Sequence, residues 1–298
     1  FVRKLTEPEG ILQPRQSVFA VAINEMRDGD AAVEHVAIGG PYVSHGLGDT
    51  PSRQAIFGCR PKTIERDEEE LCARQILSTL ARRAYRRPVD TVDLDTLMKF
   101  YRTGRVGGNF DAGIQLALER LLISPDFLFR LERDPTDITP GTNYVLNDLE
   151  IASRLSFFFW SSGPDDQLLD LAERGELDDP NVLKAQALRM LADPRSAEFV
   201  RNFAGQWLYL RNLNSVVPDA IEFPEFDENL RRAFRQETEL FINSLIREDH
   251  SVLDLIDSDY TFVNERLARH YGIPNIYGSH FRRVSLDGDL AQHRGGIF

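Results

Sequence analysis

The stretch Leu146–Trp160, LNDLEIASRLSFFFW, has the pattern of a helix start followed by a deeply buried helix. Asn147 or Asp148 can cap the free backbone N–H groups of the first turn. Apolar residues then recur at three- and four-residue spacing, and Phe157 and Trp160 widen that face until little polar surface is left. Because a helix this apolar must be covered on most sides, we expect the other helices to pack around it.

Arg154 is the one long charged residue within the apolar part of this segment, so burial would require an acidic partner or a route to solvent. In a helical core, the best candidate partners are Glu237 and Glu239 on the longest predicted helix. Such a contact would be structural, because it would orient two helices. The functional alternative makes the two glutamates an acid/base pair in a cleft, as in glycoside hydrolysis. Residues two apart on a helix point in different directions, which weakens that alternative.

The composition is that of a globular protein with a real core. The chain has 298 residues, of which 42% are hydrophobic and 28% are charged. The net charge of −12 argues against nonspecific nucleic-acid binding, and no apolar run approaches the roughly 20 residues that span a bilayer. The sequence begins with Phe1 rather than Met and stops at residues 295–298, GGIF. We therefore expect a piece of a longer precursor, in which a missing signal peptide says nothing about compartment.

The predicted fold is mainly α, a multi-helix orthogonal bundle preceded by a small partial β-sandwich segment. Residues 1–61 would be the last strands of a β domain, residues 62–133 a helical domain, and residues 144–298 a larger helical domain truncated at its C-terminal end. Alternating and β-branched patterns predict three strands in the first part and one near the end, at Ser17–Ile23, Val33–Ile38, Ala55–Cys59 and Phe281–Ser285.

Helical patterns and stop signals fill most of the remaining chain. The helix from Asp67 to about Tyr85 ends in the basic cluster RRAYRR. This cluster could bind an anion, but the helix dipole and pairing with nearby acids are the favoured explanation. In the helix predicted over Ser196–Leu210, Trp207 belongs to an apolar stripe and is expected in the core. The other predicted helices cover 93–103, 109–122, 165–174, 181–192, 227–249 and 264–270.

The chain has two cysteines, Cys59 and Cys72, on either side of a predicted strand-to-helix junction. A disulfide between them would close a loop of about 14 residues and stabilise the fold by about 3 kcal/mol. We favour the disulfide, because the two cysteines lie close in sequence at a domain boundary, over the alternative of two reduced cysteines, one of them buried. The pair has neither metal-ligand spacing nor the C-x-x-C-H pattern of covalent haem attachment.

Sequence motifs for phosphate-binding loops, dinucleotide binding, zinc proteases and serine hydrolases are absent. The densest group of residues able to hold a metal is His280, Asp287, Asp289 and His293, but nothing in the sequence fixes their geometry, so a solvated loop is the favoured interpretation. His270, at a predicted helix end, is a weak catalytic candidate; a cationic or packed ring is the usual outcome there.

Several long phrases together resemble large planctomycete proteins built from planctomycete-specific domains of unknown function. They are CARQILSTLARRAYRRP at Cys72–Pro88, SPDFLFR at Ser124–Arg130, Leu146–Trp160, NFAGQWLYLRNL at Asn202–Leu213, and DYTFVNERLARHYGI at Asp259–Ile273. Before residue 59 the likeness is limited to GDTPSRQAIFGCR at Gly48–Arg60, and the preceding strands look like the end of a carbohydrate-binding-like domain.

The resemblance implies a secreted or periplasmic, multi-domain protein, often linked to a c-type cytochrome domain. It carries no catalytic residues over to this chain. We expect no cofactor here, with haem possible elsewhere in the precursor. The favoured hypothesis is a scaffold or docking module in a redox-linked or polysaccharide-processing assembly, which would contact polysaccharide or other domains of the precursor. The alternative is part of an enzyme that acts on polysaccharide.

Overall fold

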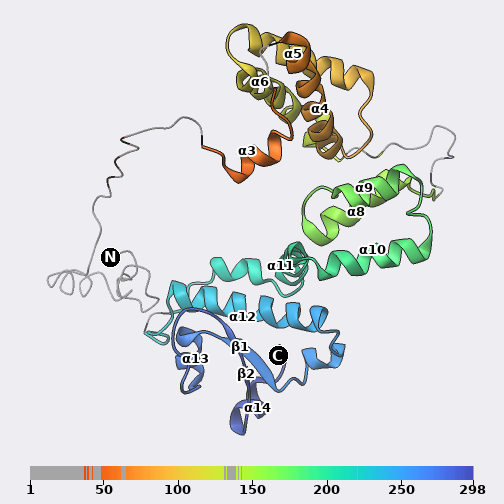
Figure 1. Cartoon of the computed structure of the whole chain (residues 1–298). Helices are drawn as coiled ribbons and strands as arrows, with labels where there is room; N and C mark the ends of the chain where they lie inside the picture. Colours follow the sequence, from red (N-terminus) through yellow and green to blue (C-terminus); the bar gives the residue numbers. More distant parts are fainter. Residues whose placement is uncertain are drawn as a thin grey trace. The chain divides into compact units, whose positions relative to one another are not determined.

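The computed structural model describes residues 48–61, 65–130, 143–219 and 221–297, and the isolated positions 37, 39, 42, 132, 139 and 141. These residues form helices and one small sheet, which confirms the predicted mainly-α class (Figure 1). They divide into two compact units, called here the first unit, within residues 41–196, and the second unit, which includes residues 197–298. The strands predicted at Ser17–Ile23 and Val33–Ile38 lie outside the described residues.

The first unit contains eight described α-helices and a short 3₁₀-helix. They are α3 (Pro51–Ile56), α4 (Arg66–Tyr85), α5 (Thr91–Val106), α6 (Phe110–Leu122), α7 (Pro125–Leu128), α8 (Asp148–Trp160), α9 (Asp166–Glu173), α10 (Pro180–Ala192) and η2 (Pro194–Ser196). The second unit contains α11 (Ala197–Trp207), η3 (Leu210–Asn214), α12 (Glu228–Arg247), η4 (Val252–Leu255), β1 (Tyr260–Val263), α13 (Glu265–Tyr271), β2 (Arg282–Ser285) and α14 (Asp289–Arg294).

The strand predicted at Ala55–Cys59 is wrong, because α3 occupies its first two positions and no strand follows. Thr50 caps α3 by accepting a hydrogen bond from the backbone N–H of Arg53, and Pro51 stands in the first turn. A capping threonine followed by proline is a helix start, and it outweighs a β-like pattern of only five residues.

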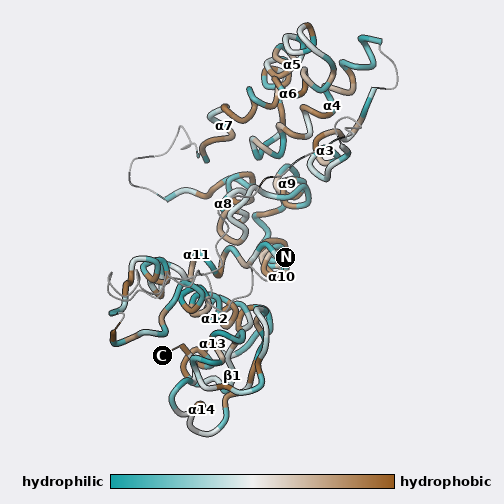
Figure 2. Tube along the Cα trace, turned by 90° about the vertical axis from the view of Figure 1, so that its left-hand side faces the viewer, coloured by the Kyte–Doolittle hydropathy of each residue, from teal (hydrophilic) through white to brown (hydrophobic). Residues whose placement is uncertain are grey.

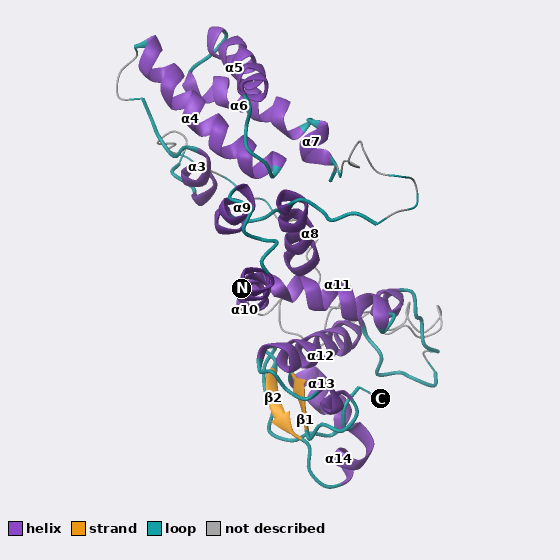
Figure 3. Ribbon diagram, turned by 90° about the vertical axis from the view of Figure 1, so that its right-hand side faces the viewer, coloured by secondary structure: helices purple, strands orange, loops and turns teal. Residues whose placement is uncertain are grey.

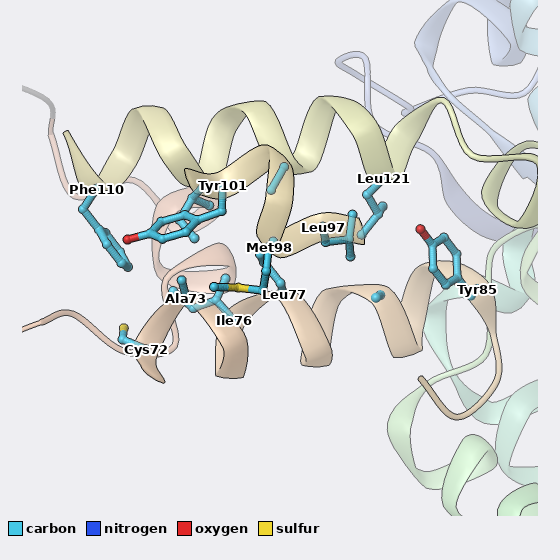
Figure 4. Packing of buried hydrophobic residues seen from close by; sticks show 13 residues of the cluster. Cys72, Ala73, Ile76, Leu77, Tyr85, Leu97, Met98, Tyr101, Phe110 and Leu121 are labelled. Carbon is cyan, nitrogen blue, oxygen red and sulfur yellow. The ribbon is translucent and has the colours of Figure 1, made fainter. Parts of the chain in front are cut away.

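Helices α4, α5 and α6 enclose one apolar core of the first unit (Figure 4). Ile76 and Leu77 of α4 meet Leu97 and Met98 of α5, and all four side chains are almost fully buried. A side-chain carbon on Gly113 of α6 would lie 2.7 Å from a ring carbon of Tyr101, so these two helices can approach this closely only with glycine there. The predicted Cys59–Cys72 disulfide is confirmed, and it ties the segment after α3 to α4.

Helix α8 begins and ends as predicted, but it is not the central helix. Asn147 and Glu150 form a capping box, and Ala152, Ser156, Phe159 and Trp160 are buried. Phe158, by contrast, is 58% exposed. The predicted burial on most sides is therefore wrong, because α8 packs against α9, α10 and η2 on one side.

Arg154 accordingly lies at the surface of α8, with 57% of its side chain exposed. Its guanidinium donates two hydrogen bonds, of 2.5 and 2.7 Å, to Glu132. The predicted partners, Glu237 and Glu239, are therefore wrong. Glu132 follows α7 rather than lying on the longest helix, and no local pattern marks it as a partner.

The second unit is organised along α12, against which α11, α13 and β1 pack (Figure 3). The strand predicted at Phe281–Ser285 is confirmed as β2. It pairs antiparallel with β1, so that Tyr260 lies opposite Ser285 and Val263 opposite Arg282. Strand β1 was not predicted, since its four residues are too few for a clear alternating pattern.

Hydrophilic and hydrophobic positions alternate along the helices of both units (Figure 2). Among the described residues, no helix combines the length and the apolar character that crossing a membrane requires.

Candidate functional site

A pocket of about 200 Å³ lies in the second unit. It is formed by α12, β1, α13 and the chain from α14 onward, and its lining consists of Glu237, Thr238, Phe241, Thr261, Tyr271, His293, Arg294, Gly296 and Ile297. Helix α12 is amphipathic along its 20 residues, with an apolar side that includes the buried Phe241 and Ile242. That packing holds Glu237, one turn before Phe241, beside β1 and α13.

The carboxylate of Glu237 joins three elements of this unit. The hydroxyl of Thr261 on β1 donates a 2.5 Å hydrogen bond to Oε1, and the hydroxyl of Tyr271 on α13 donates a 2.6 Å hydrogen bond to Oε2. Burial raises the pKa of Glu237 above its ordinary value, although both hydrogen bonds oppose the change. This carboxyl group is therefore easier to protonate than an exposed glutamate.

Among the described residues, Glu237 forms no ion pair, although the positive charge of Arg294 partly opposes the rise of its pKa. Arg294 instead places its guanidinium carbon 3.7 Å from the centre of the Tyr271 ring. Burial and the neighbouring Glu237 raise the pKa of Tyr271 far above its ordinary value, so Tyr271 stays a hydrogen-bond donor. A carboxylate that accepts one hydrogen bond on each oxygen still has acceptor capacity for a polar ligand.

The pocket brings together two residues that the sequence placed in different candidate groups, Glu237 and His293. Sequence reasoning missed Thr261, Tyr271 and Arg294. Tyr271 lies 34 positions from Glu237 in the chain, and neither residue belongs to a motif that would link them. Only the approach of α13 and β1 to α12 could have identified them.

Glu239 does not share this pocket. It lies 4.0 Å from guanidinium nitrogens of both Arg201 and Arg235, and burial raises its pKa. The two glutamates therefore do not face a common cleft. Their spacing of two residues on the helix had already indicated this. His270 lies against the Phe234 ring, with Nδ1 3.7 Å from the carboxylate of Glu225.

The described members of the group His280, Asp287, Asp289 and His293, which the sequence offered only as weak metal ligands, lie in different surroundings. His280 has its ring 3.5 Å from a nitrogen of Arg282, Asp287 is exposed, and His293 lies at the pocket. The side chain of Asp289 lies outside the described ones. Within the described residues, no three His, Cys, Asp or Glu side chains come together in a way that could hold a metal ion.

Trp207 is not a core residue, contrary to prediction, since 48% of it is exposed. Successive ring centroids of Phe199, Phe203 and Trp207 on α11 are 5.6 and 5.7 Å apart. We call these three residues the aromatic row. Helix α11 instead buries Val200 and Ala204 against α12. The aromatic row lies on the neighbouring face of the helix, at the edge of this contact.

Two segments of the chain match models of protein families. Residues 146–273 match PSD4, described as a protein of unknown function (DUF1592), and residues 72–132 match PSD5, described as a protein of unknown function (DUF1595). The predicted resemblance to proteins built from domains of unknown function is confirmed at this level. No curated protein and no solved structure matches the chain.

Proposed function

We propose that this chain is a non-catalytic docking module of a larger exported protein, and that the aromatic row binds another domain of that protein. The module would hold together an assembly for redox or polysaccharide-processing chemistry. Both cysteines of the chain are used in one disulfide, so a covalently attached haem would belong to another part of the longer protein.

The exposed aromatic row is the observation that supports docking most directly. Phe203 is 49% exposed and Trp207 is 48% exposed, and Tyr209, which follows α11, is 73% exposed. Adjacent exposed aromatic side chains are characteristic of protein-binding surfaces, where Trp and Tyr carry much of the binding energy. Phe199 packs partly against the core of the second unit, and the row continues from it to the half-exposed Phe203 and Trp207.

The Cys59–Cys72 disulfide supports an extracytoplasmic location, because disulfides persist in oxidising compartments. We therefore place the module in the periplasm or outside the cell.

The test is binding of the other domains of the same protein, each produced as a purified polypeptide, measured by calorimetry. One of these domains should bind the chain, and Trp207→Ala should weaken that binding at least tenfold, since a central aromatic contact contributes about 2 kcal/mol or more. Tyr277→Ala is the matched control: Tyr277 is an aromatic residue of the same unit and is 69% exposed. Equal losses in the two variants, or no binding by any domain, would exclude docking through the aromatic row.

One observation favours a second candidate, part of an enzyme acting on polysaccharide. Glu237 is a largely buried carboxyl group with a raised pKa in a pocket, the setting in which a glutamate acts as a general acid. The described lining of the pocket contains no second carboxylate, so the paired carboxylates of most glycosidases are not present there. His293 would have to be the proton-transfer partner.

This candidate is tested by assaying the longer protein against a broad panel of polysaccharides. Glu237→Gln should abolish any turnover, whereas Glu239→Gln, on another side of the same helix, should leave it unchanged. Turnover that survives Glu237→Gln would exclude the pocket as the catalytic centre.

A further inference from the structure

A second pocket, of about 210 Å³, lies in the first unit, and four arginines line it: Arg86, Arg87, Arg130 and Arg154. They come from the end of α4, the chain after α7, and α8. The basic cluster RRAYRR thus divides in the structure. Arg82 and Arg83 bind Asp166, Asp170 and Glu173 on α9, which fits the structural explanation, whereas Arg86 and Arg87 face the pocket.

Arg86 has no carboxylate within salt-bridge distance in the described part of the chain. Its guanidinium donates to the backbone carbonyl oxygens of Ala84, Asp126 and Phe129 at 2.5 to 2.9 Å, which leaves two of its N–H donors for other acceptors. Burial lowers the pKa of Arg86, an effect that a bound anion would oppose. Arg86 also has a φ of 58°, the left-handed conformation that ends α4.

Arg130 is the second cation of this pocket without a described carboxylate partner. It is exposed, and its guanidinium carbon lies 4.8 Å from the centre of the Phe157 ring. The guanidinium of Arg86 lies 5.9 Å from the same ring. One phenylalanine thus contacts both arginines at the pocket.

The acidic residues of the lining are already engaged. Asp126 accepts a hydrogen bond from Arg87, which also binds Asp93. Both oxygens of Glu132 accept from Arg154, and Glu150 accepts from the backbone N–H of Asn147 in the capping box of α8. Asp126 and Glu132 act on Arg86 and Arg130 as neighbouring charges, but among the described residues neither arginine forms an ion pair with a carboxylate. The first turn of α8 adds its positive dipole end at the same pocket.

We propose that this pocket binds a small oxyanion, a carboxylate, phosphate or sulfate group, between Arg86 and Arg130. Guanidinium groups form paired hydrogen bonds with such groups, and a partly buried site strengthens them. The proposal does not depend on the aromatic row or on Glu237.

The test is a calorimetric titration of the chain with sulfate, inorganic phosphate and glucuronate, each at constant ionic strength. At least one should bind saturably at one site, and the comparison of the three separates an inorganic anion from the carboxylate of a sugar acid. Arg130→Gln should weaken binding at least tenfold, and Arg130→Lys should weaken it less. Because Arg130 is exposed, neither change should affect folding, whereas a change of Arg86 would also remove three contacts to the backbone.

Arg120→Gln is the matched control, since Arg120 also lies over a phenylalanine ring, that of Phe100, but outside the pocket. The Arg120→Gln variant should bind the anion as tightly as the unchanged chain does. An equal loss in Arg120→Gln and Arg130→Gln, or no saturable binding of any of the three anions, would overturn the proposal.

Discussion

The buried carboxylate Glu237 of the second unit contrasts with the ion-paired carboxylates of the first unit. In the first unit, Asp166 and Asp193 lie near the surface and pair with Arg83 and Arg195. In the second, Glu237 is buried and is held by two neutral hydroxyl groups. Ion pairing stabilises the charged form of a carboxylate, whereas burial without an ion pair stabilises its protonated form.

This contrast gives Glu237 and the ion-paired carboxylates opposite effects on stability as the pH changes, and the second unit also has a carboxylate of the paired type, Glu248, whose pKa His250 and Arg283 lower. The hydrogen bond from Arg195 lowers the pKa of Asp193 to about 2, and that from Arg83 lowers the pKa of Asp166. Such groups stabilise the fold above their unfolded pKa, and that stability is lost as the pH falls through the folded value. Glu237 has a raised pKa, so its contribution to stability is lost when the pH rises rather than when it falls. One type of residue therefore does not have one effect on stability, because its surroundings decide the sign.

The largest expected effect concerns the apolar core of the first unit. Leu77→Ala should lower the free energy of unfolding by about 2 to 5 kcal/mol, because Leu77 is fully buried among α4, α5 and α6. Leu71→Ala on the same helix should change it by less than about 0.5 kcal/mol, since Leu71 is 70% exposed. Urea unfolding measures both. Similar losses in the two variants would contradict the assigned core.

The disulfide should have the next largest effect. Replacing both Cys59 and Cys72 by serine should destabilise the first unit by about 3 kcal/mol, through the greater freedom of the unfolded chain. The change should leave the unfolding of the second unit unaltered, since the bridge lies within the first. Hydrogen exchange resolved by peptide distinguishes the units, and an equal loss of protection in both would show that they unfold together.

Two helix glycines should respond in opposite directions. Gly113→Ala should destabilise by about 1 to 3 kcal/mol, because the added carbon would meet the Tyr101 ring at 2.7 Å. Gly205→Ala in α11 should stabilise by about 0.5 to 1 kcal/mol, since the space there is open and alanine favours helix. Thermal unfolding of the two variants measures the difference, and a stabilising Gly113→Ala would exclude the close approach of α5 and α6.

The smallest expected effect is the pH response of Glu237. Its folded-state pKa is raised above 4.5, so its contribution to stability is present below that value and is lost as the pH rises through the folded pKa. Glu237→Gln should remove this loss, whereas the ion-paired Glu248 of the same unit keeps its own contribution.

The two tryptophans allow each unit to be followed separately, because Trp160 lies in the first and Trp207 in the second. Trp207→Phe leaves Trp160 as the fluorescent reporter, and Trp160→Phe leaves Trp207. When Trp160 is the reporter, the measured stability of the first unit should fall as the pH is lowered. An unchanged profile for the second unit in Glu237→Gln would show that the carboxyl group titrates as if it were exposed.

The sequence by itself determined where most helices lie and how they begin. The capping box of α8, the cap of Asn109 on α6 and the cap of Asn264 on α13 are all formed, because a cap depends on residues within three positions. The sequence segments that resemble proteins built from domains of unknown function could likewise be recognised from the sequence alone.

The tertiary structure alone decided which face of each helix is covered and which distant residues meet. Phe158 and Trp207 have the hydrophobicity of core residues, yet both are about half exposed, because the neighbouring helices cover a different side. Arg154 meets Glu132 rather than a residue of α12, and Glu237 meets Tyr271 across 34 positions. Hydrogen bonding within a helix is local in sequence, whereas side-chain contacts depend on how separate elements pack, which no local pattern encodes.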